Sequence, residues 1–294
     1  MIKKWFFVTR PWSFVVSATP VIMTVVFMIW KGFLPDINWL NAVLALVGII
    51  FFHAAGNVLS DYFDYKTGID NPDAFCVPNL VSGEFKAKDY LVYSIILFAI
   101  GCLIGIVLTF RSSLLLLAIG ISGALLTLLY SRSKFYALGD LLIFIVFGVL
   151  PMIGTSLVSA SHIEWSTLLL SVPVGFITVA VLHSNNTRDI PTDLKAGIRS
   201  FASVIGEKAS LAAYIFYIWS PIVYTIIMTA VGLFPVWTLA VILSAPVVLA
   251  NTKQALKYKT EGLSAFNQLD LMTAKLQMVS SICLVAGFVV SSII

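Results

Sequence analysis

Three aspartates and one asparagine crowd into a short stretch of an otherwise apolar chain, His53 to Asp70, which reads HAAGNVLSDYFDYKTGID. If a helix continues through this stretch, Asn57, Asp61 and Asp64 fall at i, i+4 and i+7 and share one face. Carboxylates on one helical face repel one another and are costly to remove from water. We therefore expect them to bind a cation or to face a water-filled cavity.

A second stretch of the same kind occurs much later, from His183 to Ser200, with the sequence HSNNTRDIPTDLKAGIRS. Its Asn185, Asp189 and Asp193 are spaced i, i+4 and i+8, and each stretch begins with a histidine. We expect Pro191 to disturb a straight helix between the two aspartates. The two stretches form a weak internal repeat, which indicates a duplicated helical unit.

Two carboxylate clusters that oppose each other suit a hard divalent cation. Mg²⁺ takes oxygen ligands, typically one or two carboxylates together with waters and substrate phosphates. The predicted metal ligands, of which the four aspartates are also the predicted catalytic residues, are Asn57, Asp61, Asp64, Asn185, Asp189 and Asp193.

Basic side chains near the same stretches suit the remaining charge of a diphosphate. The predicted substrate contacts, besides Asn57 and Asn185, are Lys66, Arg188, Lys195 and Arg199. Arg10 fits either a substrate contact or a topology charge, and Tyr130 fits a cavity wall. Carboxylates that can bind a metal and basic side chains that can bind phosphate occur together at the edge of the membrane. This combination indicates a lipid-linked diphosphate as the ligand.

The composition places these residues in a membrane protein. The chain has 294 residues, of which 60% are hydrophobic and only 11% are charged, and its mean hydropathy is +1.00. Soluble proteins contain about 25% charged residues, so we predict an all-α polytopic membrane protein. The three cysteines have no CxxC spacing, which argues against a disulfide framework or a thiolate metal site. The net charge of +4 is modest and indicates no nucleic-acid partner.

Nine apolar runs reach the roughly 17–25 residues that a bilayer-spanning helix needs. They are 13–30, 39–60, 90–110, 113–131, 138–159, 166–187, 209–231, 235–252 and 276–294. With the N-terminus in the cytoplasm, 16 of the 18 Lys and Arg residues lie inside, which the positive-inside rule favours. The sequence therefore predicts an N-in, C-out protein of the cell (inner) membrane.

The cytoplasmic side is also where we expect the chemistry. Twelve of the fourteen acidic residues fall there, although acids gain nothing from the topology rule. The inside loops 61–89, 187–208 and 253–275 exceed the usual connection length of about 2–8 residues, as functional loops often do. Neither a domain boundary, a cleavable signal nor a protein partner is indicated, so residues 1–294 form one predicted domain.

The two acidic stretches closely resemble the Asp-rich motifs of the UbiA superfamily of intramembrane aromatic prenyltransferases. The DYxD form at Asp61–Asp64 and the NNxRDxxxDxxxG run at Asn185–Gly197 look most like 1,4-dihydroxy-2-naphthoate polyprenyltransferases of menaquinone synthesis. The opening TRPWSFVVSATPV, from Thr9 to Val21, is similar to the RPxSF-type start of that branch. The nine spans match as well, so the resemblance covers essentially the whole chain.

This resemblance implies nine helices around a central cavity that opens to the cytoplasm. It also implies that Mg²⁺ bridges the four aspartates and the diphosphate of a polyprenyl donor. An aromatic ring then attacks C1 of the donor as diphosphate departs, with loss of the ring carboxylate in the naphthoate branch.

Two features depart from the naphthoate branch and leave the acceptor open. Asn79 stands where Arg or Lys is expected, and the loop Tyr130–Asp140 lacks the compact Tyr/Pro pattern of that branch. The alternatives are 4-hydroxybenzoate or another quinone precursor as acceptor.

A different class, an ion-coupled secondary transporter, also remains open. Transporter acids should lie near the bilayer midplane. Asn57, however, is about 27 Å along the helix from Trp39, at 1.5 Å per residue, which places it near the inner surface.

Several other polar residues have simpler interpretations. His53 and His183 lie inside spans, where we expect hydrogen-bonded packing rather than catalysis. Asp70 and Asp73 fit either a second layer around the metal or a loop turn. The acids expected to be helix caps or interfacial charges are Asp36, Asp140, Asp270, Glu164 and Glu261.

Overall fold

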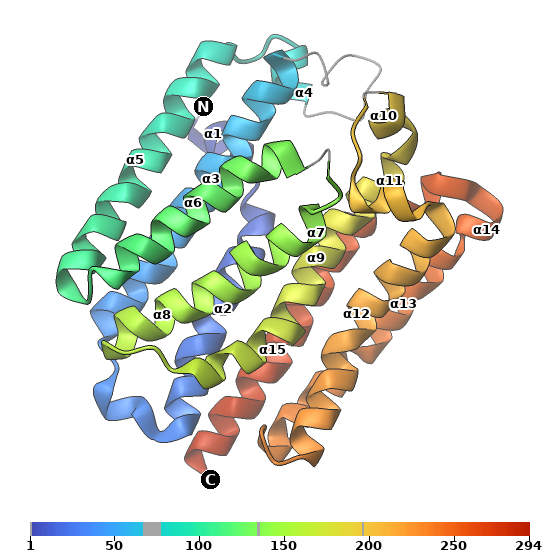
Figure 1. Ribbon diagram of the computed structural model, residues 1–294. Coiled ribbons are helices and arrows are strands. Elements are labelled where there is room, and N and C mark those ends of the chain that lie inside the picture. Colours follow the sequence, from blue (N-terminus) through green and yellow to red (C-terminus); the bar gives the residue numbers. More distant parts are fainter. Residues whose placement is uncertain (1, 67–77, 134–135, 196) are drawn as a thin grey trace.

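The computed structural model describes residues 2–66, 78–133, 136–195 and 197–294, with only the backbone for residues 2, 78 and 128–133. Throughout these ranges the regular elements are helices, as the composition predicted (Figure 1). Eight helical segments are long and apolar enough to cross a membrane. The ninth predicted span, 113–131, corresponds to α6 (Leu115–Ser133), whose apolar part within the described side chains, Leu115–Thr127, is shorter.

Four of the eight segments are single helices: α3 (Trp39–Lys66), α5 (Ala87–Arg111), α12 (Glu207–Ala230) and α15 (Leu269–Ile293). The other four are built from consecutive pieces: η1 (Pro11–Ser13), α2 (Phe14–Met28), η2 (Ile29–Phe33) and η3 (Leu34–Asp36); α7 (Gly139–Ile143), η4 (Phe144–Val149) and α8 (Leu150–Ala160); η5 (Trp165–Leu170) and α9 (Ser171–Arg188); and η6 (Val236–Ser244), α13 (Ala245–Leu256), α14 (Tyr258–Glu261) and η7 (Gly262–Phe266). Short helices outside the spans are α1 (Ile2–Val8), α4 (Pro78–Val81), α10 (Ile190–Lys195) and α11 (Phe201–Ile205).

The predicted spans agree with these helices to within six residues at each end, with two clear exceptions. The eighth span was expected to end at residue 252, but its consecutive helical pieces continue to Phe266. The last span was expected to begin at residue 276, but α15 begins at Leu269. Asp270 lies in the first turn of α15, where a negative charge is stabilised by the partial positive charge of the helix N-terminus. The polar residues before 276 therefore belong to the helix rather than to the preceding loop.

Close helix contacts depend on glycine at two crossings. A Cβ atom on Gly287 of α15 would lie 2.5 Å from the carbonyl oxygen of Trp237 in η6. A Cβ atom on Gly148 of η4 would lie 3.2 Å from the Cα atom of Gly175 in α9. Small residues let helix backbones approach in this way inside membranes. The main hydrophobic core then fills the space among α2, α9, α12, α13 and α15, and includes Met23, Phe27, Ile177, Ile218, Val248 and Phe288.

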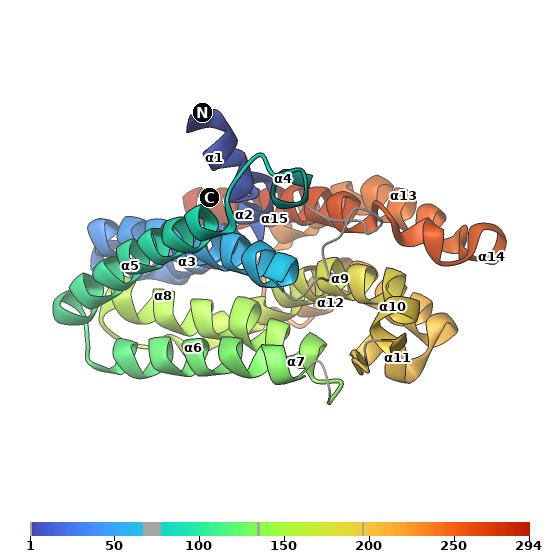
Figure 2. The same ribbon diagram turned by 90° about the horizontal axis from the view of Figure 1, so that it is seen from above.

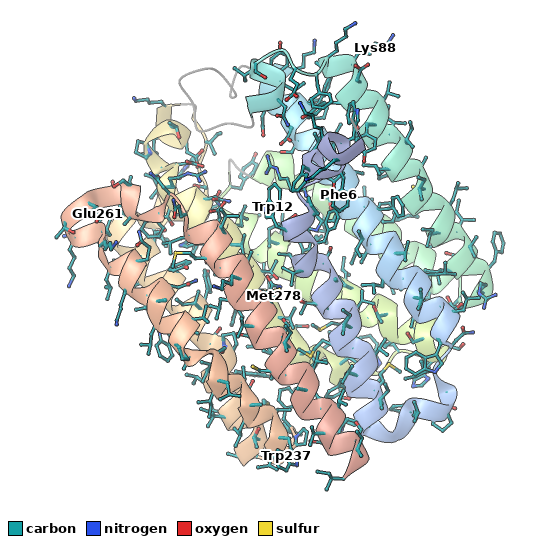
Figure 3. All side chains as sticks on the ribbon, turned by 180° about the vertical axis from the view of Figure 1, so that it is seen from behind. Phe6, Trp12, Lys88, Trp237, Glu261 and Met278 are labelled. Carbon is teal, nitrogen blue, oxygen red and sulfur yellow. The ribbon has the colours of Figure 1, made fainter. Side chains whose placement is uncertain are left out.

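The end of α3 and the end of α9 reach the same end of the helical bundle, where α4 and α10 also lie (Figure 1). Seen from above, α1 and α4 occupy neighbouring positions on one face of the molecule (Figure 2). The C-terminus lies at the opposite end of the bundle from α4 and α10 (Figure 1). The side-chain view places Lys88 and Glu261 toward the end that carries the motifs and Trp237 at the other (Figure 3). Both Asp-rich stretches therefore share one end of the molecule.

Candidate functional site

The first Asp-rich stretch continues the helix as far as Lys66, which meets the condition under which Asn57, Asp61 and Asp64 share a face. Helix α3 runs to Lys66 and so carries Asn57, Asp61 and Asp64. The side chain of Asp61 is 2% exposed, whereas Asp64 is half-buried and accepts a hydrogen bond from the Ser60 hydroxyl at 3.3 Å. A carboxylate as deeply buried as that of Asp61 requires a cation nearby.

Arg10 supplies that cation from the turn between α1 and η1. Its guanidinium Nη2 donates to Oδ1 of Asp61 and forms an ion pair with it. The backbone of Arg10 is left-handed, with φ 53° and ψ 60°, which is uncommon for a residue with a side chain. This turn directs the side chain of Arg10 to α3. Arg10 is therefore paired with an aspartate of the first motif, and its contact with the substrate stays a prediction.

Two polar residues of α3 hold the turn that presents Arg10. The side-chain amide of Asn57 donates to the carbonyl oxygen of Thr9 at 2.9 Å and to the hydroxyl of Ser13 at 3.1 Å. The ring nitrogens of His53 lie 3.3 Å from the Ser13 hydroxyl and 2.9 Å from the Ser17 hydroxyl. The hydrogen-bonded packing role predicted for His53 is thus confirmed. The Asn57 amide nitrogen is engaged in this turn, and only its oxygen is left for a metal.

The second stretch ends one helix and begins another. Helix α9 stops at Arg188 with Asp189 as its C-cap, and α10 begins at Ile190 with Pro191 as its second residue, so the predicted disturbance is a real break. The backbone N–H of Asp193 still donates to the carbonyl of Asp189 at 2.8 Å. This bond keeps the two carboxylates one helical turn apart despite the proline.

Arg188 forms a two-pronged ion pair with its neighbour in the chain. Its Nε and Nη2 donate to the two carboxylate oxygens of Asp189 at 2.7 and 2.8 Å. Arg188 is positively charged throughout the physiological pH range. Each motif therefore has one aspartate paired with an arginine, Asp61 with Arg10 and Asp189 with Arg188.

A closed turn fixes Asp193. The hydroxyl of Ser200 donates to Oδ2 of Asp193 at 3.0 Å, and the N–H of Ile198 donates to the Asp193 carbonyl at 2.8 Å. The carbonyl of Arg199 accepts a bond from the N–H of Ala137 at 2.9 Å. The segment after α6 is thereby joined to the second motif.

The donor set fits a hard metal ion. Oδ1 of Asn185 is buried and has no hydrogen-bond partner among the residues that the structure describes, so it is an oxygen available for a ligand. The four aspartates supply carboxylate oxygens, the type of ligand that Mg²⁺ prefers. Within the described ranges, however, no three His, Cys, Asp or Glu residues come close enough to hold a metal ion. A metal shared by both motifs would therefore need water and substrate oxygens as further ligands.

The remaining predicted substrate contacts are less constrained. Lys66, Lys195 and Arg199 are exposed at the same end as the motifs. Tyr130 lies in α6, but its side chain is outside the described part of the structure, as are all atoms of Asp70 and Asp73. For these residues the sequence-based assignments stay predictions.

Comparison with known proteins identifies the fold and the family. A sequence model of the UbiA prenyltransferase family matches residues 20–272. The chain belongs to the UbiA prenyltransferase family. It is 31% identical over 289 residues to UbiA prenyltransferase domain-containing protein 1 of Xenopus tropicalis, covering 96% of this chain and 80% of that protein.

Solved structures agree on the fold. An apo UbiA homolog from Aeropyrum pernix K1 aligns with a TM-score of 0.62 at 18% identity, over 91% of this chain and 96% of that one. A UbiA homolog from Archaeoglobus fulgidus bound to DMAPP and Mg²⁺ aligns with a TM-score of 0.57 at 16% identity, over 95% and 99% of the two chains. The predicted prenyltransferase class is confirmed by the family. The relative's name specifies no acceptor.

Sequence reasoning missed the hydroxyl groups that support the site. Ser13, Ser17 and Ser200 were not identified, although Ser13 and Ser17 lie in the TRPWSFVVS stretch that carried the family resemblance. It also missed the hydrogen bonds of Asp140, which was expected to be a cap or an interfacial charge. Asp140 is 6% exposed and contacts Nδ1 of His183 at 2.7 Å. Asp140 does lie in the first turn of α7, as the helix-end interpretation expected, but its carboxylate is buried inside the bundle and is not an interfacial charge.

Proposed function

We propose that this protein transfers a polyprenyl group from a polyprenyl diphosphate to the ring of an aromatic acceptor, with Mg²⁺ as cofactor. The observation that carries the proposal is the placement of two Asp-rich motifs at one end of the bundle, each with an arginine on one carboxylate. The acceptor we propose is 1,4-dihydroxy-2-naphthoate of menaquinone synthesis. Its basis is the likeness of the motifs to that branch.

The four aspartates, with the side-chain oxygens of Asn57 and Asn185, are the groups that would hold the metal. When bound, Mg²⁺ neutralises the diphosphate and makes it a better leaving group. The buried Asn185 oxygen supports this assignment, because a polar atom without a partner is costly to bury. It is also supported by the structural likeness to a homolog that binds DMAPP and Mg²⁺.

Arg10 and Arg188 have a double role in this proposal. Without substrate they balance the charge of Asp61 and Asp189. With a diphosphate present, their planar donor groups can pair with its oxygens and stabilise the charge that develops as it departs. Lys66, Lys195 and Arg199 add positive charge where the diphosphate would enter from the cytoplasm.

The reaction breaks the bond between C1 of the prenyl chain and the diphosphate oxygen, and the electron pair leaves with the diphosphate. An electron-rich ring carbon then forms a new carbon–carbon bond to C1. The ring regains aromaticity by losing a proton or, with the naphthoate acceptor, its carboxylate as carbon dioxide. Surrounding helices exclude the water that would otherwise capture the allylic cation.

The topology we propose is N-in, C-out with nine spans, and the site faces the cytoplasm from the cell membrane. A C-terminus at the opposite end of the bundle from the motifs supports it (Figure 1). The distribution of basic residues supports it as well, because only Lys31 and Arg111 fall on the other side. In this orientation the central cavity that the family resemblance implies would open to the cytoplasm.

The proposal is tested with protein purified in detergent, Mg²⁺, geranyl diphosphate and a panel of aromatic acids. We expect Mg²⁺-dependent release of diphosphate and prenylated product with 1,4-dihydroxy-2-naphthoate. Product formed only from 4-hydroxybenzoate or another precursor would show that the proposed reaction is correct and that the acceptor is not 1,4-dihydroxy-2-naphthoate. No diphosphate release with any acceptor would overturn the enzyme assignment, and ion-coupled flux in vesicles would then favour the transporter.

A further inference from the structure

A buried polar cluster lies at the start of the second Asp-rich stretch and includes none of the predicted metal ligands. Its centre is His183 of α9, which is fully buried, and Asp140 in the first turn of α7. His183 Nδ1 lies 2.7 Å from Oδ2 of Asp140, and Nδ1 is the donor because a carboxylate only accepts. The hydroxyl of Tyr217 in α12 donates to the same oxygen at 3.3 Å.

The other carboxylate oxygen of Asp140 is buried and has no hydrogen-bond partner within the described residues. Burial of a carboxylate costs free energy, and apolar residues of similar volume often stabilise a helix interface better. Stability alone therefore does not account for this carboxylate. The hydrogen bond between Asp140 and His183 requires a defined orientation of the two side chains, which apolar packing does not.

The second ring nitrogen of His183 is tied to a third helix. Nε2 lies 2.8 Å from the hydroxyl of Ser210, in the first turns of α12. That hydroxyl is 2.5 Å from the hydroxyl of Thr187, which donates to the His183 carbonyl at 2.7 Å. One imidazole thus joins α7, α9 and α12.

The helix period places the cluster and the site on opposite sides of α9. Residues four apart share a face at about 100° per residue, so His183 and Thr187 face α7 and α12 together. Asn185 and Asp189 also lie four apart, linked by the Asp189 N–H to the Asn185 carbonyl at 2.9 Å. Their side is about half a turn away from the first pair. A rotation of α9 that broke the cluster would turn both proposed metal ligands away.

We propose that Asp140, His183 and Ser210 are positioning residues that set the rotation of α9 and thereby present Asn185 and Asp189 to the Mg²⁺–diphosphate substrate. This inference rests on the proposed function and adds residues to its site. Outer residues that orient metal ligands typically contribute about 10–100-fold to metal affinity or activity. We expect substitution of these positioning residues to lower Mg²⁺ affinity or activity by a factor in the same range.

The experiment compares three variants of the full chain in detergent: Asp140→Ala, Asp140→Asn and Thr178→Val. Asp140→Ala removes the acceptor, whereas Asp140→Asn keeps an oxygen for His183. Thr178→Val is the matched control, because it removes the buried hydrogen bond from Gln277 to the same helix at 2.9 Å, about one and a half turns before His183. Ser210→Ala breaks the opposite side of the cluster and replaces Asp140→Ala if that protein does not fold.

Two readouts separate positioning from stability. We expect Asp140→Ala to raise the KM for Mg²⁺ and for geranyl diphosphate about 10-fold or more. Asp140→Asn should have KM values close to those of the wild type. Thr178→Val should lower the melting temperature and leave both KM values unchanged. Hydrogen exchange, which needs no activity, should be faster over residues 184–193 in Asp140→Ala and Ser210→Ala, and unchanged there in Thr178→Val.

The outcomes are distinguishable. Unchanged KM values and unchanged exchange over 184–193 in a folded Asp140→Ala or Ser210→Ala protein would overturn the positioning role. Equal effects of Thr178→Val and Asp140→Ala would overturn it too, because general loosening of α9 would then suffice. A wild-type protein that releases no diphosphate refutes the proposed function, whereas a negative result in the variants of an active wild type refutes only this inference.

Discussion

Arg10 offers the sharpest test of the site, because its backbone and its side chain have separable effects. The left-handed backbone, with φ 53°, costs a residue other than glycine about 1–2 kcal/mol. The guanidinium pairs with the buried carboxylate of Asp61, and a hydrogen bond to a charged group contributes about 1.5–3 kcal/mol. Arg10→Ala and Arg10→Gly both remove the ion pair, but only glycine relieves the backbone.

The two variants should therefore differ in stability and agree in activity. Glycine also lowers the free energy of the unfolded chain by about 0.4–1 kcal/mol, because it has more backbone conformations there, and this offsets part of the gain. We therefore expect Arg10→Gly to exceed Arg10→Ala by a net of about 1 kcal/mol in free energy of unfolding. Both should lose about 2 kcal/mol of transition-state stabilisation, which is a fall of about 30-fold in kcat/KM. Arg10→Lys should recover only part of the lost kcat/KM, since an ammonium group lacks the planar, two-pronged donor geometry of a guanidinium.

The assays are thermal unfolding in detergent and initial rates of prenyl transfer from geranyl diphosphate. Wild-type kcat/KM in Arg10→Gly would show that the arginine has no part in the reaction. An Arg10→Gly protein that is less stable than Arg10→Ala would contradict the argument from backbone strain. The stability comparison thus tests the backbone of Arg10, and the activity comparison tests its side chain.

Five further substitutions test the site and the fold. Asp61→Ala and Asp189→Ala should each abolish turnover while folded protein stays in the membrane, and full activity in either would refute the metal assignment. Ser200→Ala should cost about 1 kcal/mol of stability through the lost cap of α11 and raise the Mg²⁺ requirement through Asp193, measured by melting and by Mg²⁺ titration. Gly287→Ala should lower stability by about 1–3 kcal/mol, because its Cβ would meet the Trp237 carbonyl at 2.5 Å. Gly120→Ala in α6, with open space around it, should be neutral or stabilising, and equal losses would contradict the packing argument.

Much of the fold was predictable because its information is local. A run of apolar residues of sufficient length specifies a span, since an unpaired backbone polar group is too costly inside a bilayer. The continuation of α3 through Asn57, Asp61 and Asp64 followed from helical spacing, and the break at Asp189 followed from Pro191. The start of α15 at Leu269 was missed because polar residues can occupy the first turns of a helix outside the apolar core.

The sequence by itself determined the helical class, the spans and the two Asp-rich motifs, because hydropathy and periodicity are properties of neighbouring residues. Only the tertiary structure decided which groups meet. Arg10 and Asp61 are 51 positions apart, and Asp140 and His183 are 43 apart. Such pairings depend on how helices pack and rotate, which no local pattern encodes. The tertiary structure thereby paired Arg10 with the first motif and placed Asp140, expected to be a cap or an interfacial charge, as a buried acceptor at the start of α7.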